Sequence, residues 1–150
     1  MTRLVIARHG NTFAPDEPPR RIGRRTDLPL VDKGRDQAAR LGVYLQERGL
    51  VPDRIYCSTL KRTIQTAQGA IAVMGLGNTP EQRSIFDEID YGPDEDKTEE
   101  QVRARLGAEA LRAWEEDNIV PCGWQPDART IIHNWHAFAD EMLAQYPDGI

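Results

Sequence analysis

The sequence predicts an α/β fold, a three-layer α/β/α sandwich built on a mainly parallel sheet. Two features lead to this prediction. Short apolar runs, typical of buried strands, alternate with longer segments in which apolar residues recur every three or four positions, as in amphipathic helices. This alternation is typical of a parallel sheet covered by helices. The chain has 150 residues, the size of one domain, so we expect a single domain over residues 1–150.

The first predicted elements are a strand and a helix joined by a long loop. Residues 3–8 form a short apolar run, which we expect to be a strand buried on both faces. Prolines and glycines are spread over residues 10–31 and predict a loop there. Asp32 is expected to cap a helix over residues 33–48, because aspartate accepts hydrogen bonds from the free amides of a first turn.

The same alternation continues through the middle of the chain. Residues 54–57 form a second short apolar run and predict a second strand, and residues 81–85 predict a third. Between them, the apolar residues of 60–74 recur at spacings of four and three and predict a helix. A further helix is expected over residues 99–117, with a break near Gly107 because glycine is a poor helix former.

The C-terminal part is predicted to hold one more helix, over residues 127–146. A Pro-Asp-Gly turn and Ile150 follow it, and this sequence is typical of the approach to another strand. The acidic run at residues 94–100 is expected to lie in solvent.

Composition excludes several functional classes. The net charge of −5 argues against general nucleic-acid binding, which needs a strongly basic surface. The chain has no apolar stretch of about 20 residues that could cross a membrane. The two cysteines, Cys57 and Cys122, form no disulfide framework or metal-binding pair, so we expect a reducing, cytoplasmic environment and no metal site.

The strongest local motif is the run from Arg8 to Thr12, directly after the first predicted strand. Ligands of parallel sheets bind at the carboxyl ends of strands, which places His9 where a catalytic group is expected. A neutral imidazole can attack phosphorus, and Arg8 could neutralise phosphate oxygens. Gly10 allows a close approach of the backbone, while Asn11 and Thr12 offer donors. The motif alone is equally compatible with a strand end that holds a satisfied histidine.

Two further segments suggest phosphate chemistry. A helix N-terminus attracts anions, so the cations Lys61 and Arg62 in a first turn indicate a bound anion there. Glu88 could donate a proton to a leaving alkoxide if its surroundings favoured the protonated form. Each segment also has a plain structural interpretation, a solvated basic turn for the first and an acidic loop for the second. Either segment taken alone favours that interpretation.

The order of these segments resembles the histidine phosphatase superfamily, the phosphoglycerate-mutase-like proteins. The resemblance covers nearly the whole chain and rests on Arg8-His9-Gly10, the loop 23–30 leading to Lys33-Gly34, the segment 58–67, and Glu88 with Gly92. It implies a three-layer α/β/α fold, a phosphohistidine intermediate and no metal or cofactor.

The resemblance also implies roles for individual residues. His9 corresponds to the nucleophile, Arg8 and Arg62 to phosphate-binding arginines, and Glu88 to the acid that protonates the leaving oxygen. The expected substrate-binding residues are Gly10, Asn11, Thr12, Gly23, Arg24 and Arg25. The four arginines of residues 20–25 predict a substrate with more negative charge than one phosphate; a solvated basic loop is the alternative.

The sequence departs from the family near its end. The family has a second active-site histidine, usually followed by glycine, after one more strand, and this chain has no further His-Gly pair. His133 and His136 lie inside the last predicted helix and do not match that position. A longer parent protein that supplies the missing C-terminal strand is the explanation we favour. A naturally short form, or a strand supplied by a second chain in a dimer or swapped assembly, are the alternatives.

Three functions follow from the resemblance. The first is hydrolysis of a small phosphorylated metabolite through a phosphohistidine on His9. The second is a mutase, which the chain length disfavours because family mutases carry longer insertions. The third is a phosphate-ligand binder with impaired catalysis. No nucleic-acid or membrane partner is expected.

Overall fold

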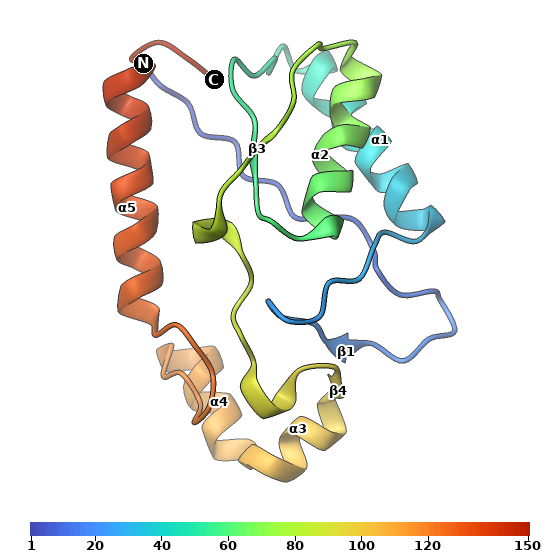
Figure 1. The fold of residues 1–150 in the computed structure, drawn as a ribbon, viewed down its shortest axis with the longest axis vertical. Helices are drawn as coiled ribbons and strands as arrows, with labels where there is room; N and C mark the ends of the chain where they lie inside the picture. Colours follow the sequence, from blue (N-terminus) through green and yellow to red (C-terminus); the bar gives the residue numbers. More distant parts are fainter.

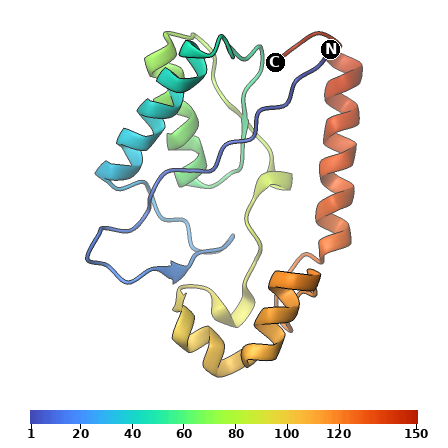
Figure 2. The ribbon, with the colours of Figure 1, turned by 180° about the vertical axis from the view of Figure 1, so that it is seen from behind.

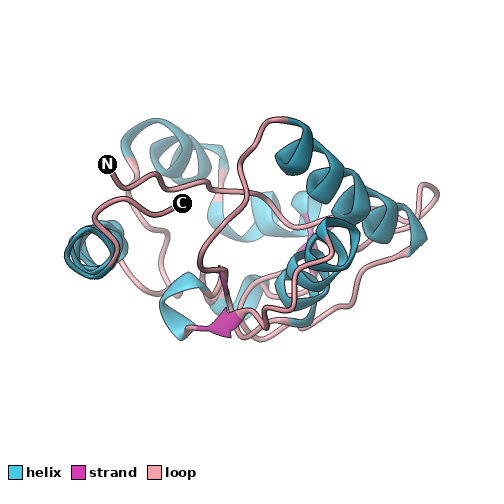
Figure 3. Ribbon diagram, turned by 90° about the horizontal axis from the view of Figure 1, so that it is seen from above, coloured by secondary structure: helices cyan, strands magenta, loops and turns pink.

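The computed structural model describes all residues from 1 to 150 and has three layers. Helices α1 (Asp32–Glu47) and α2 (Lys61–Met74) form one outer layer, and α5 (Ala128–Gln145) forms the other. Extended segments of the chain run between them (Figures 1 and 2). Seen from above, α5 stands end-on at one side and the α1–α2 pair lies on the opposite side (Figure 3). This arrangement confirms the predicted fold class.

The strands in the middle layer are short. Strand β2 (Tyr56–Cys57) pairs in parallel with β3 (Glu81–Gln82), so the second and third predicted strands are confirmed in part of their length. A second, antiparallel pair joins β1 (Arg20–Arg21) to β4 (Lys97–Thr98). This pair was not predicted, because its residues are polar and lie far apart in the sequence. It ties the loop after His9 to the segment that precedes residue 99.

The predicted strand at residues 3–8 is wrong. The segment is extended, but its one backbone hydrogen bond runs from the Arg3 N–H to the Gly149 carbonyl, at 2.9 Å. Leu4, Val5 and Ile6 are 46, 45 and 75% exposed. An apolar groove of about 330 Å³ lies along this segment and is lined also by residues 54–57 and by α5. The run is apolar as predicted, but no neighbouring strands pair with it.

Helices α1 and α2 pack closely through small residues. A Cβ on Gly42 of α1 would lie 2.6 Å from the carbonyl oxygen of Ala70 in α2. In the reverse direction, a Cβ on Gly69 of α2 would lie 2.8 Å from the Cβ of Ala38. Glycine in a helix interior destabilises the helix. At these two positions it also lets the two helix backbones come into close contact. Both helices contact the loop that carries His9, through Gly34 of α1 and Thr66 of α2.

Two helix boundaries are set by local chemistry. The N-cap of α1 is Val31 rather than Asp32, and no side chain caps the helix. Asp32 instead lies in the first turn, where its negative charge interacts favourably with the helix dipole. The predicted break at Gly107 is confirmed: it separates α3 (Glu99–Leu106) from α4 (Ala108–Asp117) with φ at 83°.

Helices α3 and α4 surround a small core of their own. Its buried residues are Ile89, Val102, Leu111 and Trp124. The prediction that the acidic run 94–100 is solvated is wrong for Asp94, which is 1% exposed. Its carboxylate accepts hydrogen bonds from Arg105 Nε at 2.6 Å and from Trp124 Nε1 at 2.7 Å. A buried carboxylate needs such partners, and they come from segments 11 and 30 residues away.

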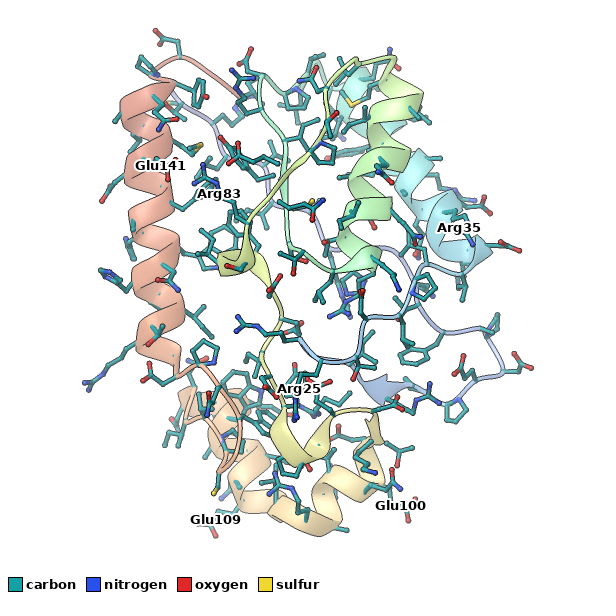
Figure 4. The ribbon with its side chains drawn as sticks, viewed as in Figure 1. Arg25, Arg35, Arg83, Glu100, Glu109 and Glu141 are labelled. Carbon is teal, nitrogen blue, oxygen red and sulfur yellow. The ribbon has the colours of Figure 1, made fainter.

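Helix α5 is attached to the middle layer by aromatic contacts and one ion pair. The rings of Phe86 and Phe138 meet edge to face at 4.8 Å, and Tyr56 meets Phe138 at 5.1 Å. Arg83 donates two hydrogen bonds to Glu141, at 2.7 and 2.9 Å, and the two side chains face each other in Figure 4. No helix of the protein is long and apolar enough to cross a membrane.

Candidate active site

His9 is half-buried and its ring is oriented by its neighbour. The ring atom Nδ1 lies 2.8 Å from the carbonyl oxygen of Gly10. A carbonyl oxygen can only accept, so Nδ1 carries the proton and the lone pair of the neutral ring resides on Nε2. The Gly10 N–H donates to Thr66 Oγ1 at 3.0 Å, and that hydroxyl donates to the Arg62 carbonyl at 2.7 Å. The histidine loop is therefore tied to the first turns of α2.

The same loop rests against the start of α1. A Cβ on Gly10 would lie 2.3 Å from the Gly34 carbonyl oxygen, and one on Gly34 would lie 2.2 Å from the Asn11 carbonyl oxygen. Only glycine fits at these two positions. The Asn11 N–H also donates to Gln37 Oε1 at 2.8 Å. Helices α1 and α2 thus hold the backbone around His9 from two sides.

Burial is the main influence on the His9 ring and lowers its pKa. The positive charges of Arg62 and Arg8 lower the pKa further, whereas the Gly10 hydrogen bond and the charge of Glu88 raise it. The charges that act on His9 are thus those of the two predicted phosphate-binding arginines and of the predicted acid. At a pH where a free histidine is largely protonated, His9 retains more of its neutral, nucleophilic form.

Arg62 is the most deeply buried charged group of the site, with 1% of its surface exposed. Its guanidinium donates to the carbonyl oxygens of Thr26 at 3.0 Å, Ile22 at 3.3 Å and Gly23 at 3.4 Å. The Nε atom is buried and has no hydrogen-bond partner. A buried N–H without a partner is costly, and burial lowers the pKa of this guanidinium. The site therefore holds a cation whose remaining donor suits an anionic oxygen.

Lys61, the other cation of this turn, is already paired. Its backbone N–H donates to Asp27 Oδ1 at 2.7 Å, and its Nζ atom lies 3.8 Å from Asp27 Oδ2. The carboxylate of Asp27 thus accepts the hydrogen bond of the first amide of α2, at the place where the sequence predicts a bound anion. Of the two cations, Arg62 is the one whose charge acts on His9.

Glu88 lies just beyond the short 3-10 helix Ser84–Phe86 and is half-buried. Its Oε1 atom accepts the N–H of Ile89 at 3.0 Å. Tyr91 was not identified from the sequence, yet the charge of this carboxylate acts on its phenol. Burial raises the pKa of Tyr91, and the negative charge of Glu88 raises it further. The phenol therefore stays protonated and can donate to Glu88.

The basic loop is more heavily paired than the sequence suggests. Three of its arginines form ion pairs with carboxylates of the segment 90–99: Arg20 with Asp96 at 2.7 Å, Arg21 with Glu99 at 2.7 Å, and Arg25 with Asp90 at 2.9 Å. Arg24 is exposed and lies 3.7 Å from Asp87. Figure 4 shows Arg25 between the middle layer and the α3–α4 region. Substrate contact by Arg24 and Arg25 stays a prediction.

The remaining predicted residues take different positions. Gly23 is buried, and a Cβ there would lie 2.2 Å from the Ile89 carbonyl oxygen. Thr12 is also buried, whereas Asn11 is exposed. His133 and His136 are both exposed residues of α5. His9 also lines the apolar groove beside residues 3–7.

The site combines three groups: a neutral imidazole with a free Nε2, a buried arginine with an unpaired N–H, and a carboxyl group. This combination suits proteins that bind or cleave phosphate esters. Residues 4–150 match the model of the histidine phosphatase superfamily, branch 1. The chain belongs to this family.

Relatives of known type include 2,3-bisphosphoglycerate-dependent phosphoglycerate mutases. The protein of Thermobifida fusca (strain YX) is 36% identical over 125 residues, which is 81% of this chain and 49% of that protein. The protein of Mycobacterium leprae (strain Br4923) is 34% identical over 120 residues, which is 79% of this chain and 47% of that protein. The chain spans about half the length of these curated relatives.

Solved structures of the same fold include a phosphatase and a mutase. A mycobacterial glucosyl-3-phosphoglycerate phosphatase aligns with a TM-score of 0.77 at 24% identity, over 94% of this chain and 63% of that one. A phosphoglycerate mutase from Thermus thermophilus aligns with a TM-score of 0.63 at 27% identity, over 89% of this chain and 68% of that one.

Proposed function

We propose that the protein hydrolyses a small phosphate monoester through a phosphohistidine formed on His9. The proposal is carried by two features that occur in the same protein. The Nδ1 atom of His9 is engaged by a carbonyl oxygen, and Arg62 is buried with its Nε donor unsatisfied. The first leaves a nucleophilic lone pair on Nε2. The second offers a charge and a donor for phosphoryl oxygens. Membership of the histidine phosphatase superfamily supports the same chemistry.

The proposed reaction has two steps. The Nε2 lone pair of His9 attacks phosphorus, the P–O ester bond breaks, and a protonated Glu88 passes its proton to the leaving alkoxide. Water then attacks the phosphohistidine, Glu88 takes a proton from that water, and the N–P bond breaks to release phosphate. Arg62 and Arg8 stabilise the charge on the phosphoryl oxygens in both steps.

A mutase is the second candidate, because the relatives at 36 and 34% identity are phosphoglycerate mutases. It shares the first step, but a second hydroxyl of the substrate replaces water as the acceptor. Binding of a phosphorylated ligand without turnover is the third candidate. The three differ in what happens to the phosphoryl group after it meets His9.

The test uses 3-phosphoglycerate labelled with phosphorus-32, together with His9→Ala. We expect release of phosphate and a base-stable, acid-labile label on the protein. Both should fall by a factor on the order of 10³ or more in His9→Ala, since loss of a nucleophile removes the covalent route. Conversion to the 2-phospho isomer would favour the mutase. Binding of the ligand with no label under any condition would overturn the covalent mechanism.

A further inference from the structure

Glu95 sits in the acidic run that follows the 3-10 helix Gly92–Asp94, outside the motifs of the proposed mechanism. Its carboxylate accepts hydrogen bonds from Gly23 N–H at 3.0 Å, Tyr91 N–H at 3.2 Å and Arg25 N–H at 3.3 Å. It also accepts a hydrogen bond from the Thr26 hydroxyl. All four partners are donors, and three of them belong to the segment 23–26.

That segment is the one that holds Arg62. The guanidinium donates to the carbonyl oxygens of Ile22, Gly23 and Thr26, whereas Glu95 binds N–H and O–H donors of the same turn. Gly23 and Thr26 therefore donate to Glu95, through an N–H and a hydroxyl respectively, while their carbonyl oxygens accept from Arg62. The turn has no regular secondary structure beyond β1 at residues 20–21. Two backbone hydrogen bonds, from Arg24 N–H to the Ile89 carbonyl and from Thr26 N–H to the Gly23 carbonyl, act together with these side-chain contacts to shape it.

We propose that Glu95 is a positioning residue of the active site, which fixes the turn 22–26 and thereby aims Arg62 at the phosphoryl group. The inference rests on the proposed phosphate-binding role of Arg62. A carboxylate suits the position because it presents only acceptors to four donors. A glutamine of the same size would turn an NH2 group towards backbone N–H groups, and at least one donor would lose its partner. The negative charge of Glu95 also helps to keep the buried guanidinium protonated.

The test compares Glu95→Gln with two matched variants. Glu100→Gln makes the same charge change at an exposed residue nearby (Figure 4), and Glu99→Gln removes the ion pair with Arg21 without touching the turn. Two quantities are measured: exchange of the Arg62 guanidinium protons by NMR without ligand, and the Kd for orthovanadate by calorimetry. In Glu95→Gln we expect faster proton exchange and a Kd raised by about 10- to 100-fold, as for small misplacements of a binding group.

Unchanged exchange and an unchanged Kd in folded Glu95→Gln would overturn the proposal, as would equal effects in Glu99→Gln. If the wild-type protein fails to bind orthovanadate, the proposed function fails, and the exchange measurement still decides whether Glu95 holds Arg62. Should Glu95→Gln not fold, Thr26→Val removes one donor with little change in shape. Thr26→Val must then give smaller increases in the Arg62 proton exchange rate and in the Kd for orthovanadate. No change in either quantity would count against the proposal.

Discussion

At the scale of single residues, a hydrogen bond and a charge pattern give His9 its chemical character. Histidine has two ring nitrogens, and the partner of one decides what the other can do. Here the Gly10 carbonyl engages Nδ1, which leaves the lone pair on Nε2, the atom we propose as the nucleophile. Burial and the two arginines favour the neutral ring. A neutral ring can attack phosphorus, whereas a protonated one cannot.

We predict that His9 titrates below the usual histidine pKa of about 6.5. The expected direction follows from burial first and then from Arg62 and Arg8. Arg8→Gln should raise the pKa, because it removes a positive charge, and Glu88→Gln should lower it, because it removes a negative one. The measurement is an NMR titration of the ring proton, with His9→Asn to assign the resonance.

This shift also links folding to pH. The unfolded chain binds a proton at His9 more readily than the folded chain, because the folded pKa is the lower one. The contribution of His9 to stability is therefore complete above the unfolded pKa and falls as the pH drops through the window between the two values. A His9 pKa above 6.5, a lowered pKa in Arg8→Gln or a raised pKa in Glu88→Gln would contradict the assigned environment.

At the scale of elements, the connection between α3 and α4 depends on one glycine. Gly107 has φ at 83° and ψ at 158°, a region that essentially only glycine occupies. Its N–H donates to the Arg103 carbonyl at 2.9 Å and so closes the end of α3. The residue sets the angle between two helices that surround the core of Ile89 and Trp124.

We predict that Gly107→Ala lowers the free energy of unfolding by about 1–3 kcal/mol through backbone strain. An added Cβ meets nothing within 4 Å, so crowding does not contribute. Gly77→Ala is the matched control, because that Cβ also meets nothing and no positive φ is present. Urea unfolding of both variants measures the effect. Equal stabilities would show that the strain is relieved by a change of the helix angle.

At the scale of the whole molecule, the middle layer presents apolar surface. Residues 4–6 are exposed although their side chains are large and apolar, and a groove of about 330 Å³ runs beside them. An exposed apolar edge favours association with other chains. Helices α1 and α2 pack closely against each other, whereas the apolar residues 4–6 of the middle layer stay exposed.

We predict that the 150-residue chain self-associates through this groove and that Ile6→Lys weakens the association. The association constant should fall by about tenfold or more, since burial of an isoleucine side chain contributes about 1.5–3 kcal/mol. Analytical ultracentrifugation measures the constant. Ile132→Lys is the control, because Ile132 is 56% exposed on α5 and does not line the groove. An equal effect of both substitutions would place the contact elsewhere.

Helices were largely predictable because their pattern is local. The apolar spacing of residues 60–74 predicts the helix Lys61–Met74 almost to the residue, and Gly107 predicts the break it makes. The absence of a strand at residues 3–8 was not predictable in this way. A strand needs hydrogen-bonded neighbours, and an apolar run does not show whether they are present. Asp94 likewise looks solvated in sequence, while Arg105 and Trp124 make its burial tolerable.

By itself, the sequence determined the fold class and most of the helices, and it predicts the four groups of the proposed mechanism, because these depend on short-range patterns and ordered motifs. Only the tertiary structure decided which ring nitrogen of His9 is free, that Arg62 is buried with one unsatisfied donor, and that Glu95 organises the turn around it. The physical reason is that these properties arise from contacts between segments far apart in the chain. Burial and hydrogen-bond partners are set by folding, and no spacing along the sequence encodes them.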